Sequence, residues 1–263
     1  MHPRRIVCLT EETTETLYLL GEQERIVGIS GFTVRPPEAR RDKPEVSAFT
    51  SANIERILGL EPDLVLGFSD LQADIAAQLI RAGVEVHVFN QRTVQGILDM
   101  VLTLGSLVGA RGRAERLVAD LLAGLAEIER EAAGLPRRPR VYFEEWDDPL
   151  ISGIGWVGEL VELAGGKECF PELRGKGLAR DRIVDPDEVV RRRPEIIVAS
   201  WCGKRFRPER VRARPGWGVV PAVRDGELHE LPASEILSPG PAALTDGVRG
   251  LHRIVRAWAA RHA

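Results

Sequence analysis

The stretch that decides the fold is SANIERILGLEPDLVLG, residues 51–67. A helix-like segment leads through a proline and an acid to an apolar run typical of a buried strand. Residues 184–200, VDPDEVVRRRPEIIVAS, repeat the same order. Asn53 lies nine positions before Pro62, and Asp185 lies nine positions before Pro194. Chance similarity between α/β segments is the alternative, but the matched spacing favours one helix–strand unit present twice, once in each half of the chain.

Around the first copy, strand-like and helix-like segments alternate. The apolar runs that we expect to be strands in this half are residues 5–9, 25–30, 62–68 and 84–89. The segments between them carry helical spacing, and glycines end two of them. Because each run is almost entirely apolar, both faces of the predicted sheet must be covered, which is typical of parallel sheets in α/β proteins. The second half mirrors this layout.

A long helix is predicted between the halves. Residues 111–135, RGRAERLVADLLAGLAEIEREAAGL, contain no proline. Leucines and an isoleucine recur at helical spacing, with charges between them. At roughly 1.5 Å per residue such a helix would be about 37 Å long, enough to span a small domain.

We therefore predict an α/β fold with two Rossmann-like lobes, residues 1–110 and 136–263, joined by the helix over residues 111–135. Each lobe would hold a central, mostly parallel sheet. Ligands of open α/β sheets bind outside the carboxyl ends of the strands. Two such lobes facing each other would therefore share one ligand cleft.

Composition excludes several function classes. The chain has 263 residues, 44% of them apolar and 29% charged, with a net charge of −3. These values are ordinary for a globular protein and give no reason to expect a nucleic-acid partner. Apolar runs are too short for a membrane span, and the three cysteines have no metal-type spacing. The chain has only five histidines, His2, His87, His229, His252 and His262, and His87 lies inside an expected strand rather than at its end, so we predict no metal site formed directly by the protein.

The opening MHPRRIVCL lacks the apolar core and cleavage site of a secretory leader. If the chain as given is full length, we expect it in the cytoplasm. If a leader was removed, we expect it outside the cytoplasm, in the periplasm or on the cell surface.

Several stretches resemble the helical-backbone class, class III, of solute-binding proteins that serve ABC importers. They include RIVCLTEETTETLYLLGEQERIVGIS, NIERILGLEPDLV, LIRAGVEVHVF, ELVELAGGKECF and VDPDEVVRRRPEIIV. Together they cover nearly the whole chain and look most like the branch that handles cobalamin, haem and ferric siderophores. The resemblance implies a small-molecule ligand held without chemistry, so no enzyme and no cofactor, although the ligand can itself carry cobalt or iron. The alternative is a cytoplasmic relative that uses the cleft as a ligand sensor, carrier or enzyme.

The resemblance also implies a partner. In the family, one acid on each lobe meets arginines of a two-fold symmetric permease, and the matching residues here are Glu55 and Asp187. Two carboxylates fixed on one monomer can dock such a basic surface, which would give the only membrane contact. The alternative is that both acids complement helix dipoles.

Residues after the expected strands are the ligand-contact candidates. They are Phe32, Arg35, Phe49 and Phe68 in the first half, and Glu145, Trp146, Trp156, Trp201, Cys202, Lys204, Arg205 and Glu235 in the second. Aromatic walls with a few polar groups suit a flat ligand, and Arg35 can meet an anion. The alternative for each tryptophan is packing inside a lobe.

Cys202 also suggests a nucleophile, because Lys204 and Arg205 can lower the pKa of its thiol. No nearby histidine and acid complete a catalytic arrangement, so we expect no catalytic residue. A thiolate can instead coordinate a metal carried by the ligand. The neighbouring acids of EEWDD, residues 144–148, should point in opposite directions from a strand, which disfavours a paired role.

Overall fold

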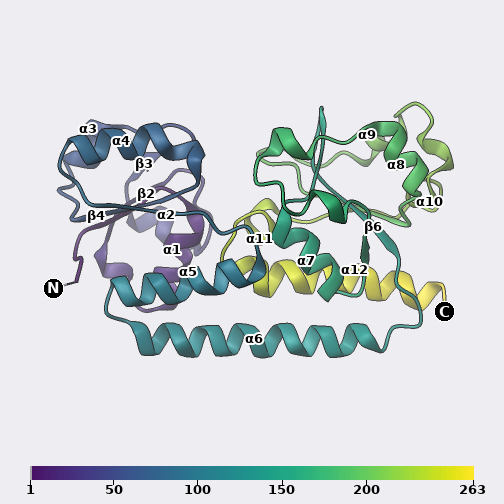
Figure 1. The fold of residues 1–263 in the computed structure, drawn as a ribbon, viewed down its shortest axis with the longest axis horizontal. Helices are drawn as coiled ribbons and strands as arrows, with labels where there is room; N and C mark the ends of the chain where they lie inside the picture. The colour runs from purple at the N-terminus through teal and green to yellow at the C-terminus, as the bar shows by residue number, and fades with distance from the viewer. Residues whose placement is uncertain (1) are drawn as a thin grey trace. The chain divides into compact units, whose positions relative to one another are not determined.

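The computed structural model describes residues 2–263 and divides the chain into two compact units (Figure 1). Unit 1 runs to Gln91 and resumes over Gln95–Asp120, whereas unit 2 comprises Arg92–Val94 and Leu121–Ala263. Each unit is an α/β body with its own sheet. The predicted α/β fold with two mostly parallel sheets is therefore confirmed.

Unit 1 is built on a five-stranded sheet in the order β3-β2-β1-β4-β5, and every pair is parallel. Its strands are β1 (Ile6–Cys8), β2 (Ile26–Ser30), β3 (Glu45–Ser47), β4 (Leu64–Phe68) and β5 (Val86–Phe89). Its helices are α1 (Glu11–Leu19), α2 (Pro37–Asp42), α3 (Ile54–Leu58), α4 (Ala73–Arg81) and most of α5 (Val94–Leu107), with 3-10 turns η1 (Gln23–Arg25) and η2 (Asp70–Gln72).

Both faces of this sheet are covered, as the apolar strands predict. Ile6 and Leu64 pack with α1 and α5 on one face, whereas their neighbours Val7 and Val65 pack with α3 and α4 on the other. Figure 1 shows these helix pairs on opposite sides of the strands. Alternating side chains of a strand point to opposite faces, so a strand buried on both faces has to be apolar throughout.

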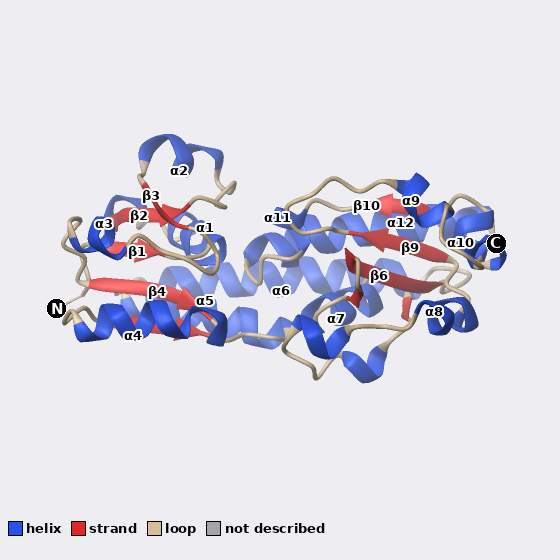
Figure 2. Ribbon diagram, turned by 90° about the horizontal axis from the view of Figure 1, so that it is seen from above, coloured by secondary structure: helices blue, strands red, loops and turns tan. Residues whose placement is uncertain are grey.

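Unit 2 holds a second five-stranded sheet in the order β10-β9-β6-β7, with β8 also paired to β6 (Figure 2). Only the β6–β7 pair is antiparallel. Its strands are β6 (Arg140–Asp147), β7 (Leu150–Ser152), β8 (Lys167–Glu168), β9 (Ile196–Ala199) and β10 (Leu228–Glu230). Its helices are α7 (Gly155–Leu163), α8 (Pro186–Arg192), α9 (Pro208–Arg212), α10 (Pro221–Arg224), α11 (Ala233–Ile236) and α12 (Val248–Arg261).

Shorter helical turns complete unit 2. They are η3 (Pro171–Leu173), η4 (Ala179–Arg182), η5 (Trp217–Val219) and the π-helical turn η6 (Ala243–Gly247). The turn η6 is followed directly by α12. A Cβ at Gly247 would lie 2.4 Å from the main-chain oxygen of Glu235, so only glycine allows this turn to approach α11.

The predicted long helix is α6 (Arg111–Ala133), which is continuous over 23 residues. Its apolar positions, among them Leu121, Leu125 and Ile128, are buried. The division into units falls inside α6, between Asp120 and Leu121. The lobe boundaries predicted at residues 110 and 136 stay predictions, as does the cleft expected between the lobes.

The repeated sequence forms the same local structure twice. Asn53 and Asp185 both cap their helix, α3 or α8, because a side-chain oxygen accepts a main-chain N–H of the first turn. Past each helix, Glu61 and Arg193 adopt left-handed backbone with φ of 47° and 51°. A proline and an acid follow in each copy, and then β4 or β9. The interpretation of one unit present twice is confirmed at this level.

An arginine fastens each copy to the neighbouring strand. The Asp63 carboxylate accepts the main-chain N–H of Arg5 at 2.9 Å, and Glu195 accepts that of Arg140 at 3.0 Å. The Nε atoms of Arg5 and Arg140 each donate, over 2.9 Å, to a carbonyl at the end of the helix. We call each set an arginine joint. Both joints bind the helix end to the amino end of a central strand, β1 or β6.

Candidate functional site

In unit 1, Phe32 and Phe49 follow the carboxyl ends of the neighbouring strands β2 and β3, whereas Phe68 is the last residue of β4. Phe32 and Phe49 are 61% and 37% exposed, whereas Phe68 is 5% exposed and belongs to the core. The Gln72 side chain accepts the N–H of Phe68 and donates to the carbonyl of Phe49, each over 2.9 Å. This amide fixes two of the loops, so the sheet edge presents apolar side chains in defined positions.

The loop that carries Phe32 is held by acids of α1. Glu11 accepts the main-chain N–H groups of Val34 and Arg35 at 2.9 and 2.8 Å. The Nε of Arg35 binds Glu15 at 2.9 Å, so this guanidinium has an internal carboxylate partner. Burial raises the pKa of Glu11 to about 7, although both N–H groups oppose the shift. The contact between Arg35 and a ligand stays a prediction.

The sequence analysis did not identify a neighbouring buried acid, Glu12. Glu12 is 2% exposed and accepts the Thr10 hydroxyl at 2.6 Å. Burial raises its pKa to about 7. The sequence places Glu12 in the first turn of an ordinary helix, and nothing in its spacing indicates burial.

In unit 2, the neighbouring acids Glu144 and Glu145 near the end of β6 bind different arginines. Glu144 is fully buried and binds both terminal nitrogens of Arg214, at 2.6 and 2.9 Å. Glu145 binds both terminal nitrogens of Arg182, at 2.6 and 3.0 Å, and Arg182 is itself only 1% exposed. Each carboxylate therefore neutralises its own arginine, and the two do not act as a pair.

Two predicted tryptophans are buried. Trp156 lies in α7, 2% exposed, and its ring N–H donates to the carbonyl of Ile236 at 2.9 Å. Trp201 is 3% exposed, and its ring N–H donates to Glu144 at 3.0 Å. The expectation that both indoles project from strand ends is wrong, because their polar edges and ring faces are used inside unit 2. Their ligand contacts stay predictions.

Trp146 and Lys204 are brought together. The Lys204 ammonium lies 3.8 Å from the centre of the Trp146 ring and forms an ion pair with Asp147. Arg210 reaches the other oxygen of Asp147 at 2.9 Å. The sequence identified Trp146 and Lys204 as neighbours of the site, but it missed Asp147 and Arg210.

Cys202 is exposed, and the activation of its thiol that the basic neighbours suggested is not found. Burial and the nearby charge of Glu145 raise the pKa of its thiol, whereas the sequence analysis expected Lys204 and Arg205 to lower it. Lys204 is engaged by Asp147, and Arg205 makes no ion pair with any residue in 2–263. Glu235 lies in the short helix α11 after β10 and is half-buried.

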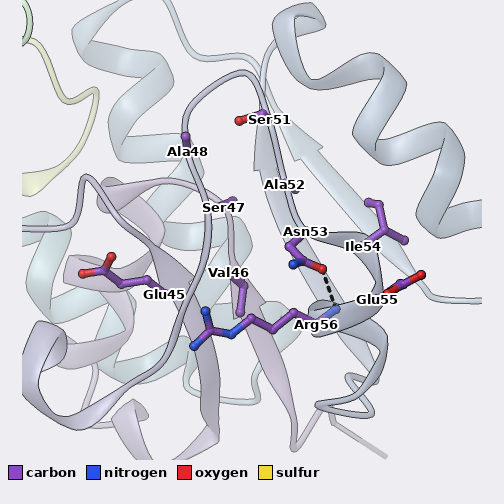
Figure 3. A pocket seen from close by; sticks show the side chains of 10 residues that line it. All are labelled: Glu45, Val46, Ser47, Ala48, Ser51, Ala52, Asn53, Ile54, Glu55 and Arg56. Carbon is purple, nitrogen blue, oxygen red and sulfur yellow. Dashed lines mark hydrogen bonds between the residues drawn. The ribbon is translucent and has the colours of Figure 1, made fainter.

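The two predicted docking acids, Glu55 and Asp187, are exposed at matching positions, each two residues after the capping side chain. Glu55 also lines an open pocket of about 650 Å³, and Figure 3 shows Glu45 and Glu55 at opposite ends of it. Asn53, which caps α3, also lines this pocket. A smaller pocket of about 310 Å³ lies between β5 and α5 and includes His87, whose pKa is lowered by burial.

Within residues 2–263, no three side chains of His, Cys, Asp or Glu are arranged to hold a metal ion. In the same range, no helix has both the length and the apolar character needed to cross a bilayer.

Comparison with known proteins identifies the family. The family model described as "Periplasmic binding protein" matches residues 6–235. A Bacillus subtilis protein named "Uncharacterized ABC transporter substrate-binding lipoprotein YvrC" is 26% identical over 258 residues, which cover 95% of this chain and 79% of the relative. The "Cobalamin-binding protein" of Halobacterium salinarum is 30% identical over 200 residues, covering 72% of this chain but only 53% of the relative.

The solved structures agree on the fold. The periplasmic haem-binding protein RhuT from Roseiflexus, in its apo form, superposes with a TM-score of 0.80 at 24% identity, covering 96% of this chain and 99% of that one. The fold that carries the strand-end aromatic residues and the arginine joints is therefore also found in solved structures. Since the family model covers most of its length, the chain belongs to the periplasmic binding protein family.

Proposed function

We propose that the protein is the substrate-binding component of an ABC importer and acts outside the cytoplasm. Its ligand is a cobalamin-like, haem or ferric-siderophore molecule. The observation that carries the proposal is the family match over residues 6–235. Relatives named for ABC transport, cobalamin and haem support it. The exposed Phe32 and Phe49 at the carboxyl edge of the first sheet support a flat, largely apolar ligand.

The protein binds and releases its ligand unchanged. The only exposed thiol within residues 2–263 is that of Cys202, whose pKa is raised, so it lacks the thiolate character that a nucleophile needs. The buried acids Glu144 and Glu145 are each neutralised by an arginine and do not reach a substrate as free carboxylates.

Ligand binding is tested by titrating the protein with cyanocobalamin, haemin and ferric siderophores, followed by absorbance and calorimetry. One of these should bind saturably with one site per chain. Phe32→Ala and Phe49→Ala should each weaken its binding by about tenfold, because each removes an exposed ring. Ile80→Ala, an equally exposed apolar side chain on α4, serves as the control. Failure of all three ligand classes to bind would contradict the proposal.

Glu55 and Asp187 are the proposed contacts to the permease. Both are exposed in the first turn of a repeated helix, α3 or α8, as docking on a two-fold partner requires. Charge reversal of either acid to lysine should weaken binding to the reconstituted importer, and the double variant should abolish it. Ligand titrations should not change. Reversal of the exposed Glu24 in unit 1 is the control, and equal loss with that variant would contradict the assignment.

A further inference from the structure

A buried carboxylate at the end of β6 supports two cations. The side chain of Asp147 is 2% exposed, and each of its oxygens meets a different base: Lys204 at one and Arg210 at the other. The side chains of Lys204 and Arg210 are 33% and 51% exposed. One buried negative charge therefore holds two positive charges at the surface, and the set is left with a net positive charge.

Aromatic rings fix the position of the lysine. The Lys204 ammonium lies 3.8 Å from the centre of the Trp146 ring and 5.4 Å from that of Trp201. The Arg210 guanidinium lies 5.7 Å from the Trp201 ring. Cation–π contacts of this kind hold a charge in place but use none of its N–H donors on an acceptor. An ammonium has three donors and a guanidinium has five, so most remain available after Asp147 is bound.

The surrounding segment adds further positive charge. Residues 204–214, KRFRPERVRAR, contain six bases and one acid. Glu144 neutralises only Arg214. Arg205, Arg207 and Arg212 are exposed and make no ion pair with any residue in 2–263. The whole chain has a net charge of −3. The excess of positive charge is therefore local to this end of the sheet and is not a property of the whole surface.

We propose that Lys204 and Arg210 form a subsite for a carboxylate group of the ligand, with the Trp146 ring beside it. The subsite rests on the proposed function and narrows it: the transported molecule is an anionic chelate or macrocycle that bears free carboxylates. Asp147 is a positioning residue, which holds the two cations apart from each other and preorganises their free donors. A carboxylate bound by two cations makes charge-assisted hydrogen bonds, which are stronger than neutral ones.

Matched pairs of probes test the subsite. Haemin is compared with haemin dimethyl ester, cyanocobalamin with its monocarboxylic acid, and ferrichrome A, which bears free carboxylates, with the uncharged ferrichrome. In whichever pair binds, the carboxylate form should bind at least about tenfold more tightly than its uncharged partner. This preference should shrink as the salt concentration rises, because the bases are partly exposed.

Variants assign the preference to the named side chains. Lys204→Gln with Arg210→Gln should remove the preference by weakening the acid form about tenfold, and should change the uncharged form by less than about threefold. Arg212→Gln, on the same helix α9 and also exposed, is the control and should keep the preference. Thermal unfolding of each variant checks that unit 2 remains folded.

The outcomes separate the two proposals. If an uncharged probe binds as tightly as its acid partner, or if the double variant keeps the preference, the subsite is overturned while the binding function stands. If no probe of any pair binds, the proposed function itself is overturned, and the subsite with it.

Discussion

Glu61 and Arg193 adopt the same left-handed backbone conformation, with φ of 47° and 51°, and each is followed by a proline. Both side chains are exposed. A Cβ in this conformation crowds the following carbonyl, which destabilises any residue other than glycine. Both copies of the repeated unit thus retain a strained residue at the turn between helix and strand.

Glycine at either position should stabilise the protein. Glu61→Gly and Arg193→Gly should each raise the free energy of unfolding by about 0.5–1 kcal/mol, because strain relief outweighs the added freedom of the unfolded chain. Urea denaturation measures the change. Glu61→Ala and Arg193→Ala keep the Cβ and should give no gain, so an equal gain with alanine would show that backbone strain is not the cause.

Removing one member of the Glu144–Arg214 pair should strongly destabilise unit 2. Glu144→Gln or Arg214→Met leaves a buried group without its charged partner and should lower the free energy of unfolding by about 3–5 kcal/mol. The Glu144→Gln/Arg214→Met double variant should recover part of this loss. Strictly additive losses in the double-mutant cycle would show that the two residues are not coupled.

Stability should fall as the pH rises from 4.5 towards 7 because of Glu12. Its pKa rises from 4.5 to about 7 on folding, so the folded state holds a proton that the unfolded state has lost in this range. The stability present below pH 4.5 is therefore lost as the pH rises through 7. At about 1.4 kcal/mol per pKa unit, the loss is roughly 2–4 kcal/mol.

Glu12→Gln should reduce this slope and make the protein more stable than the wild type at pH 8, but not at pH 4. Urea denaturation at several pH values provides the measurement. Glu24→Gln, an exposed acid of the same unit, should leave the slope unchanged. Part of the slope should remain, because burial also raises the pKa of Glu11 to about 7. An undiminished slope in Glu12→Gln would exclude Glu12 as one of its sources.

Local patterns predicted most of the fold. The apolar runs became strands of two parallel-rich sheets, and residues 111–133 formed the long helix. The repeated unit was visible because its cap, proline and strand lie close together in sequence. The arginine joints were not visible, because Arg5 and Asp63 lie 58 positions apart and no period links them.

The candidate site was predicted less completely. Proximity to a strand end identified Phe32, Phe49 and Lys204, which are accessible. The same rule included Trp156 and Trp201, which are buried, since a strand-end position does not decide which way a large ring turns. Arg214 was missed because its carboxylate partner lies 70 positions away.

The segments that end at the two arginine joints have equal length, since residues 53–63 and 185–195 span the same number of positions. Each segment begins at the residue that caps its helix. It ends at an acid that accepts a main-chain hydrogen bond from the start of the neighbouring strand, β1 or β6. The chain therefore keeps the same spacing between helix cap and strand in both units, and inserting or deleting one residue within either segment should move its acid out of register with the neighbouring strand.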